Sequence, residues 1–581
     1  MNRSDAPALP FSLARFSIIG AATLSLSALA PRASAQWVTE EFPLKAGWNA
    51  VWLSLDCSDR PLDDPDQVAP DTSLLVGSPD IEEVWRWNPA ASTATFTDSP
   101  AGPVAGDAQW HVWRRGFPAD TTLGSLTANA AYLVKVKDTV TGPYTLTLKG
   151  KPRPPRYQWK SNGLNFLGFP MQPTLALPDR SLERFLSFSS ALNNNPATFF
   201  YDGGELGANN PLRVTAPRTT SVKRGSAYWV QSTGYTDYYG PLQVTLSNSA
   251  GIDYGDALVT IRLNLKNTTT QAVTATLTPL ASATPPAGQP AVAGIVPILL
   301  RGALNPATGQ FAYTPLTGAL TKALAADEST ELVFALNRSQ MGNTPGAVFQ
   351  SIIRVTDSLN LTQIDLPVRA VTTSLAGLWA GEVVLTKVNQ IVGQTSTPAD
   401  APSEFTLRVL MHLDGAGQTR LLPQVFLGKR SGAQALATAQ SLLDATTLSS
   451  ARRLTSASFP PGTGFYNGSG TLGLTGATSF NVVLGYNAAT NPFVHTYHPD
   501  HDNLNAKFQP LPAGKESPTV SRAVTFTFQP SLPGVSEPTW GSTTVGGTYA
   551  ETITGLRAQP VAISGTFVLR RVSDITALIT Q

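Results

Sequence analysis

Cysteine is almost absent from this sequence of 581 residues, where Cys57 is the single example. One thiol excludes any disulfide within the chain. The fold must therefore depend on apolar surface buried inside modules large enough to have cores of their own. Cys57 lies in the apolar stretch AVWLSLDC, which favours a small buried hydrophobic side chain over a reactive thiol.

Charge is scarce as well, because only 14% of the residues are Asp, Glu, Lys or Arg. The sequence has no run of basic side chains, which proteins use to bind nucleic acid or anionic membranes. We therefore expect no nucleic-acid partner. Gly, Pro, Ser, Thr and Ala are abundant instead, which is typical of all-β folds, and the length is that of several domains.

The first 35 residues have the pattern of a secretory signal peptide. Arg3 and Arg15 form a basic start, residues 16–30 are apolar but too short to span a bilayer, and Ala-Ser-Ala at 33–35 is a cleavage site. No twin arginine precedes the apolar segment, and no cysteine stands at the cleavage point to accept a lipid. We predict Sec-type export to the periplasm, the cell surface or the extracellular medium, with Gln36 as the first mature residue.

Cleavage removes three arginines and one aspartate, which leaves equal numbers of basic and acidic residues. The exported chain is thus expected to be formally neutral. No later stretch is apolar for long enough to form a membrane-spanning helix, so we predict no membrane span after cleavage.

The segment after the signal peptide contains an internal repeat. Four sequence landmarks recur in the same order, and each precedes or forms an apolar run of strand length. The matching pairs are 45–49 with 160–165, 84–88 with 198–202, 130–134 with 226–230, and 142–148 with 240–246. We therefore predict two copies of one small β-module, at 36–152 and 153–250, joined by the proline-rich connector 151–156, with an amphipathic helix at 181–192 in the second copy.

The order K-A-G-W-N, then W-R-W-N, then A-Y-L-V-K-V resembles a β-module that is common in secreted bacterial multidomain proteins. The resemblance covers residues 36–250 and implies export and modular architecture, but no particular chemistry.

Residues 251–374 are expected to form a third unit. Apolar and polar residues alternate from Val259 to Lys266, as in an antiparallel strand with one buried face. Similar strands are predicted at 272–277, 331–336, 350–355 and 363–368. The turn N-T-T-T-Q-A-V at 267–273 and T-D-S at 356–358 resemble those of immunoglobulin-like β-sandwiches of the abnormal-spindle/hydin type.

Residues 375–581 form the last predicted unit, a β-barrel or β-sandwich. The unit opens with G-L-W-A-G at 377–381, continues with a strand at 383–388, and closes with strands at 548–555 and 561–572. The G-x-W motif resembles the start of lipocalin-type barrels, whose Trp packs against an Arg of the final strand, a part that Arg570 or Arg571 can take here. We predict one helix at 431–443.

Four of the five histidines lie in this last unit, and three of them are close together. His and Asp side chains are the ligands that Zn²⁺ prefers, and Asp oxygens also suit Ca²⁺. The candidate ligands are His412, His495, His498, Asp500, His501 and Asp502. The spacing matches neither a metallo-β-lactamase motif nor an EF-hand, so a hydrogen-bonded turn without metal is the competing interpretation.

Tryptophan is concentrated before residue 160. Exposed rings on a sheet would form a stacking platform for sugars, with Trp85, Trp87, Trp110 and Trp113 as the candidate residues. Trp85 and Trp87 share one face of a strand. The competing interpretation is a packed core, since Phe199 and Tyr201 take the matching positions in the second copy.

No nucleophile elbow is present, and Cys57 has no His partner in a recognisable arrangement. These features favour an exported, non-enzymatic surface or extracellular protein with an adhesive, structural or glycan-binding role, whose partners are polysaccharide or cell-envelope proteins. Two alternatives stay open at this point. One is a C-terminal barrel that binds a metal or small ligand through the 495–502 loop, and the other is a secreted hydrolase accessory protein.

Overall fold

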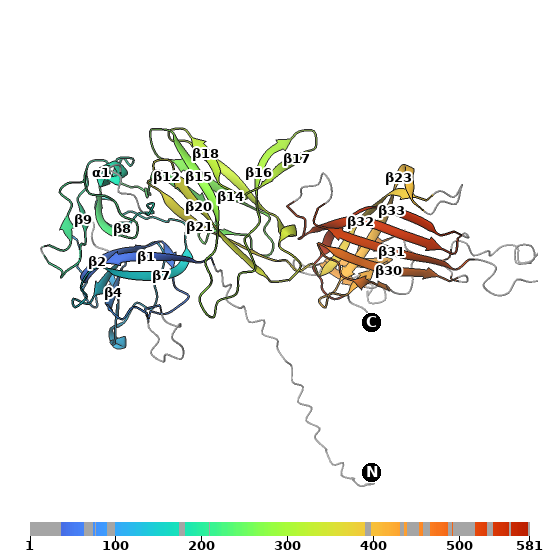
Figure 1. The fold of residues 1–581 in the computed structure, drawn as a ribbon, viewed down its shortest axis with the longest axis horizontal. Coiled ribbons are helices and arrows are strands. Elements are labelled where there is room, and N and C mark those ends of the chain that lie inside the picture. The colour runs from blue at the N-terminus through green and yellow to red at the C-terminus, as the bar shows by residue number, and fades with distance from the viewer. Residues whose placement is uncertain are drawn as a thin grey trace, which may run out of the picture. The chain divides into compact units, whose positions relative to one another are not determined.

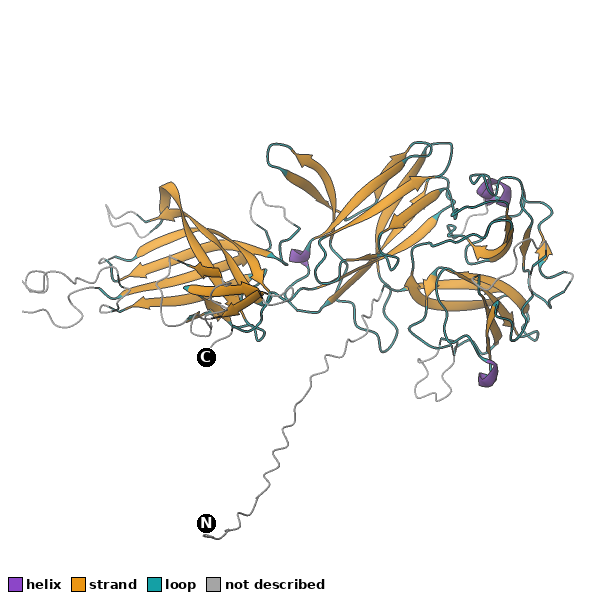
Figure 2. Ribbon diagram, turned by 180° about the vertical axis from the view of Figure 1, so that it is seen from behind, coloured by secondary structure: helices purple, strands orange, loops and turns teal. Residues whose placement is uncertain are grey.

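The computed structural model describes residues 36–62, 74–75, 77–89, 99–100, 102–173, 180–207, 209–389, 397–429, 435–438, 452–456, 465–485, 488, 491, 518–531, 538–556 and 559–578. The predicted signal peptide lies outside these residues. Strands make up almost all the regular structure, with a few short helices between them (Figures 1 and 2). The prediction of an all-β fold is therefore confirmed. Among the described helices, none combines the length and apolar character needed to cross a membrane.

The first module copy is built on a four-stranded antiparallel sheet in the order β2-β6-β4-β5. A second sheet, in the order β1-β7-β3, covers one of its faces, and apolar side chains of both sheets form a shared core. The strands are β1 (Val38–Leu44), β2 (Gly47–Leu53), β3 (Leu55–Asp56), β4 (Ile81–Trp87), β5 (Trp110–Arg114), β6 (Ala130–Val136) and β7 (Tyr144–Pro152), with a 3-10 turn at Pro118–Asp120.

The second copy repeats this strand order, because its sheet runs β8-β11-β9-β10. A short helix, α1 (Leu182–Leu186), starts at Ser181, whose side chain accepts a hydrogen bond from the amide of Arg184. The predicted helix at 181–192 is thus present but covers only its first turns. The strands are β8 (Gly163–Gly168), β9 (Thr198–Phe200), β10 (Leu212–Arg213) and β11 (Ala227–Ser232).

The repeated landmark, K-A-G-W-N at 45–49 and K-S-N-G-L-N at 160–165, makes the same hydrogen bonds in both copies. Asn49 accepts a hydrogen bond from the amide of Lys45 at 2.9 Å and donates to the carbonyl groups of Lys45 and Gly47. Asn165 makes the equivalent three hydrogen bonds to the backbone of residues 160 and 163. A buried asparagine thus closes the turn that enters the first strand of each sheet, which explains why the landmark recurs.

Strand β12 (Leu242–Leu246), which the repeat places at the end of the second copy, pairs with β14 of the following unit. That unit consists of two five-stranded sheets, in the orders β12-β14-β19-β16-β17 and β13-β21-β20-β15-β18, around an aliphatic core. Its further strands are β13 (Ile252–Asp253), β14 (Thr260–Asn267), β15 (Val273–Ala281), β16 (Ile298–Asn305), β17 (Gln310–Pro315), β18 (Leu320–Leu324), β19 (Ser329–Leu336), β20 (Val348–Asp357) and β21 (Gln363–Val371), with a 3-10 turn at Arg338–Gln340.

The predicted alternation is confirmed in β14, whose residues are exposed and buried in strict turn. Asn267 is fully buried and donates hydrogen bonds to the carbonyl groups of Gln271 and Ala325, so it holds the turn that leads into β15. Asp357 ends β20 by accepting hydrogen bonds from the amides of Leu359 and Leu361. The predicted β-sandwich is present, and a side chain of each predicted turn motif stabilises its turn through hydrogen bonds to the backbone.

The last unit contains a nine-stranded sheet in the order β28-β24-β23-β22-β33-β32-β31-β30-β29. Strands β28 and β29 are consecutive in the chain and lie at opposite ends of this order, so the sheet nearly closes into a barrel. Figure 1 shows β30 to β33 side by side. The strands are β22 (Gly377–Val388), β23 (Ala399–Leu413), β24 (Thr419–Leu421), β28 (Tyr466–Asn467), β29 (Ser469–Gly470), β30 (Gly476–Leu484), β31 (Val520–Gln529), β32 (Thr544–Thr554) and β33 (Val561–Ser573).

The interior of this barrel-like sheet is filled with side chains. Trp379 is fully buried there, and Phe526 makes edge-to-face contacts with the rings of Tyr549 and Phe567. Arg571 stands opposite Trp379 in β33 and donates hydrogen bonds to the carbonyl groups of Ser374 and Ala376, just before the G-x-W motif. Of the two candidate arginines, Arg571 therefore takes the position beside the tryptophan.

A small sheet, in the order β26-β25-β27, accompanies the barrel-like sheet. Its strands are β25 (Gln424–Lys429), β26 (Ala435–Thr438) and β27 (Arg452–Thr455). The helix predicted at 431–443 is wrong where the structure describes it, because residues 435–438 pair with β25 as a strand. The Ala-rich composition favoured a helix, but hydrogen bonding to a neighbouring strand overrides local preference.

Candidate binding cleft between the module copies

Of the six candidate metal ligands, only His412 lies among the described residues. His412 is fully buried on β23, and its Nε2 atom lies 3.0 Å from the carbonyl oxygen of Ile575. Burial lowers the pKa of His412 below its ordinary value, so the ring is neutral at pH 7. Within the described ranges, no group of three or more His, Cys, Asp or Glu side chains is arranged to hold a metal. His495, His498, Asp500, His501 and Asp502 lie outside the described residues, and a Zn²⁺ or Ca²⁺ site there stays a prediction.

The four tryptophans proposed as a sugar platform are all buried. Trp85 and Trp113 are 2% exposed, and Trp87 and Trp110 are 4% exposed. The exposed platform is therefore wrong, and the core interpretation is confirmed. The physical reason is that a second sheet covers each face: Trp113 packs toward β1 and β7, and the other three pack against the second copy.

The two copies share one aromatic core. Trp87 of the first copy meets Trp229 of the second edge to face, with ring centroids 4.9 Å apart. Phe166 stacks on Trp229 and contacts Trp110. The two four-stranded sheets therefore pack against each other through their aromatic faces. The outermost strands of the two sheets, β2 and β8, lie at the margins of this contact.

The outer edge of β2 is sealed by the second copy. The amide of Trp48 donates to the carbonyl of Gly204 at 2.8 Å, and the amide of Trp52 donates to the carbonyl of Gly225 at 2.9 Å. The equivalent strand of the second copy, β8, also lies at the end of its sheet. Its outer edge faces a cleft instead, which residues 164–167 line.

This inter-copy cleft has a volume of about 710 Å³ and lies between β4 and β6 of the first copy, β8 of the second and the connector between them. Trp52 and Tyr157 form part of its wall, with ring centroids 5.2 Å apart. The hydroxyl of Tyr157 donates a hydrogen bond to the carbonyl of Gly168 and holds the connector against the end of β8. A cavity of this size is in the range that small ligands and short peptides occupy.

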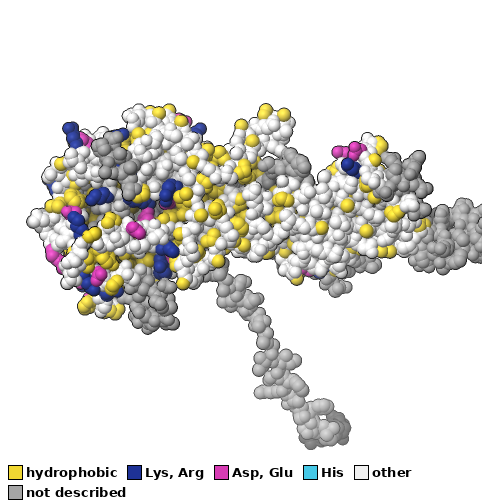
Figure 3. Space-filling model, viewed as in Figure 1, with side chains coloured by type: hydrophobic (Ala, Val, Ile, Leu, Met, Phe, Trp, Pro, Cys, Tyr) yellow, Lys and Arg dark blue, Asp and Glu magenta, His cyan; other side chains and the backbone are white. Residues whose placement is uncertain are grey.

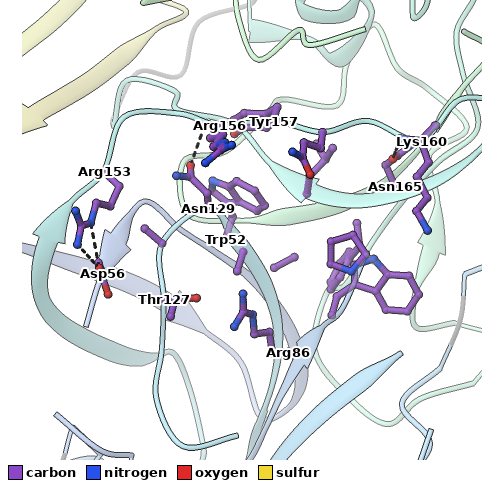
Figure 4. Close-up of a pocket in the computed structure, with 18 of the residues that line it drawn as sticks. Trp52, Asp56, Arg86, Thr127, Asn129, Arg153, Arg156, Tyr157, Lys160 and Asn165 are labelled. Atoms are coloured by element: carbon purple, nitrogen blue, oxygen red, sulfur yellow. Dashed lines mark hydrogen bonds and ion pairs between the residues drawn. The ribbon is translucent and has the colours of Figure 1, made fainter. Parts of the chain in front are cut away.

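The described lining is strongly cationic, since it holds four basic side chains and a single carboxylate. In Figure 4, Arg156 of the connector and Lys160 of the turn before β8 lie on one side, and Arg86 of β4 lies on the other. Arg153 is committed to Asp56, to which its Nη2 atom approaches within 2.6 Å. Lys and Arg side chains also gather over the two copies on the face shown in Figure 3.

Asp56 offsets the charge of one basic side chain, Arg153, with which it pairs. Although burial acts to raise its pKa, hydrogen bonds from Ser58 and Arg153 outweigh burial and lower the pKa below its ordinary value. The carboxylate is therefore ionised and paired at neutral pH. Arg86 and Arg156 line the cleft without a carboxylate partner among the described residues, and Lys160 adds a third basic side chain to the lining.

Sequence reasoning missed this cleft. Its cations come from β4, from the connector and from the turn before β8; β4 is far from the other two in the chain, and no local motif links them. The one available signal was the connector itself, where Lys151, Arg153 and Arg156 are interleaved with prolines. We interpreted that segment only as a connector between the two copies.

Comparisons with known proteins leave this chain without an assigned family. No family model matches it, and a search of curated proteins finds no match. Among solved structures, the periplasmic chaperone SfaE is similar over 31% of this chain and 92% of its own, at 10% identity and a TM-score of 0.15. A protein of unknown function from Bacteroides ovatus is similar over 57% of this chain and 95% of its own, at 8% identity and a TM-score of 0.17. Scores this low support no conclusion about fold or function, so function must be argued from the cleft.

Proposed function

We propose that this chain is an exported, non-enzymatic binding protein that holds an anionic ligand in the inter-copy cleft. The single observation that carries the proposal is the cleft lining, in which Arg86, Arg156 and Lys160 face one cavity whose only described carboxylate is already paired. Positive side chains around a concave site with low-dielectric walls concentrate anions there. The aromatic wall adds apolar contact.

Binding fits this lining better than catalysis does. The described lining residues include no His or Cys, and Asp56 is engaged by Arg153, so they supply no group that is ready to act as nucleophile or general base. Arginine recognises carboxylates through paired hydrogen bonds, which gives specificity without chemistry. Export of the chain and a surface or extracellular location are part of the proposal, and they rest on the pattern of residues 1–35.

The test is a calorimetric titration of residues 36–581 with two carboxylate-bearing probes, hexaglutamate and an oligogalacturonate. We expect at least one to bind at low ionic strength, and the affinity to fall as salt is added because the contacts are charged. Arg86→Gln and Arg156→Gln should each weaken binding about tenfold, since a charged hydrogen bond contributes roughly 1.5–3 kcal/mol.

Arg213→Gln is the matched control. Arg213 is an exposed arginine on β10, at the far end of the second sheet, and does not line the cleft. Its loss should leave affinity unchanged. The proposal fails if neither probe binds the unaltered protein, or if Arg213→Gln weakens binding as much as the two cleft variants do.

A further inference from the structure

We propose that the occupant of the inter-copy cleft is an extended acidic peptide that pairs with the outer edge of β8. This inference rests on the proposed function and names the ligand class of the same site. Its basis is a difference between two equivalent strands. β2 and β8 each begin with an asparagine-closed turn, and each lies outermost in a sheet of the same strand order.

Only one of these two edges has a partner. The backbone of β2 hydrogen-bonds to β6 on one side and to the backbone of Gly204 and Gly225 on the other. The backbone of β8 pairs with β11 on one side, and the described residues provide no backbone partner for 164–167 on the other. At that second side the chain forms the cleft.

An open strand edge is a specific template. Its amide and carbonyl groups repeat with the spacing of a β-strand, about 3.3 Å per residue, and only another extended peptide presents complementary groups at that spacing. A sugar chain can contact the cationic side chains but cannot follow the backbone ladder. The edge therefore favours a peptide over an anionic polysaccharide, by the mode in which recognition domains add a strand to a sheet.

The cleft lining determines which peptide side chains fit. Successive residues of an added strand point to opposite faces, so every second side chain meets the same wall. Arg86, Arg156 and Lys160 favour carboxylates, whereas the rings of Trp52 and Tyr157 favour apolar groups. A segment with alternating acidic and apolar residues satisfies both. Because export of the chain is part of the proposed function, the source of the segment would be another exported protein.

The experiment compares four probes by calorimetry against residues 36–581. The first is a capped hexapeptide of alternating Glu and Val, and the second and third are the same hexapeptide N-methylated on the amides of the Glu or of the Val residues. The fourth is an oligogalacturonate with three carboxylates. Because alternate amides of a strand point to opposite sides, one methylated peptide should bind at least tenfold more weakly than the parent. The other should retain most of the affinity.

The outcomes separate this inference from the proposed function. If both methylated peptides bind as tightly as the parent, strand pairing is wrong, but binding of an anion in the cleft stands. If oligogalacturonate binds as tightly as the parent peptide or more tightly, the peptide class is wrong. If no probe binds, both proposals fail. Hydrogen exchange gives an independent readout, since a paired strand should slow exchange at those amides of residues 164–167 that point away from β11, whereas a side-chain ligand should not.

Discussion

The two module copies have the same strand order and the same asparagine-closed turns, but their surroundings differ. The first copy keeps its last strand, β7, in a sheet of its own with β1 and β3. The corresponding strand of the second copy, β12, pairs with the third unit. The first copy also has the outer edge of its β2 sealed, while the edge of β8 lines a cleft. A duplicated module thus acquires a cleft from its neighbours rather than from its own internal structure.

One pair of equivalent positions shows how the copies became complementary. Counting from Gly47 and Gly163, Trp52 and Gly168 occupy the same place in the two repeats. A Cβ atom added to Gly168 would lie 2.4 Å from the Cβ atom of Trp52. The tryptophan of the first copy therefore needs the glycine of the second, and the two copies cannot have identical residues at this position.

The largest expected effect comes from Gly168→Ala. The new methyl group would also lie 2.4 Å from the carbonyl oxygen of Ser226, so backbone and ring must both move. We expect a loss of about 3 kcal/mol in the free energy of unfolding, the upper end for overpacking a core. Urea denaturation measures it. Gly124→Ala is the control because nothing lies within 4 Å of its added Cβ atom, and equal losses in both variants would contradict the packing argument.

The two turn asparagines provide the next test. Asn49→Ala and Asn165→Ala each remove three hydrogen bonds to the backbone of a buried turn. Each should cost about 2–3 kcal/mol, because backbone groups are left without partners. Near-equal losses in thermal or urea unfolding would strengthen the view that the copies are one module. If one variant is destabilised and the other is not, the shared landmark has different roles in the two copies.

A smaller effect is expected at the repeated tyrosines. Tyr132 accepts a hydrogen bond from the amide of Thr127 and donates one to its carbonyl, while Tyr228 accepts one from the amide of Lys223. Tyr132→Phe and Tyr228→Phe should each cost about 1 kcal/mol, somewhat more for Tyr132. Tyr235→Phe serves as the control since that side chain is 84% exposed. A larger loss of stability for Tyr228→Phe than for Tyr132→Phe would contradict the view that the Tyr132 hydroxyl makes the stronger set of hydrogen bonds.

The smallest expected effect is a pH-dependent contribution to stability, which only the first copy has. Asp56 of the first copy corresponds to Gln172 of the second, which does not titrate. Because the pKa of Asp56 is lowered in the fold, its ionised form stabilises the protein above the ordinary pKa of 3.8, and this contribution disappears as the pH falls through the folded value. Asp56→Asn should lower stability by about 1 kcal/mol or less at pH 7. The gap to the unaltered protein should close below pH 3.8, and a constant gap from pH 7 down to acid unfolding would contradict this origin.

Local patterns predicted much of the fold. The alternation in β14 specifies a strand with one buried face, and the landmarks around Asn49 and Asn165 locate two equivalent turns. The failures have a common cause. The helix was expected at 431–443 from the composition of that segment alone, but pairing with a neighbouring strand makes residues 435–438 a strand. The sugar platform likewise considered Trp85 and Trp87 only within their own strand, but a second sheet buries both rings.

By itself the sequence determined that this chain is all-β and modular, that no disulfide holds it, and that two of its modules are repeats. These properties follow from residue spacing, turn residues and a single cysteine, which act over a few positions of the chain. Only the tertiary structure decided that the edge of β2 is sealed, that the edge of β8 faces a cleft, and that Arg86 and Arg156 line the same cleft. The reason is that strand edges and charges acquire their partners through packing between segments far apart in sequence, which no local pattern encodes.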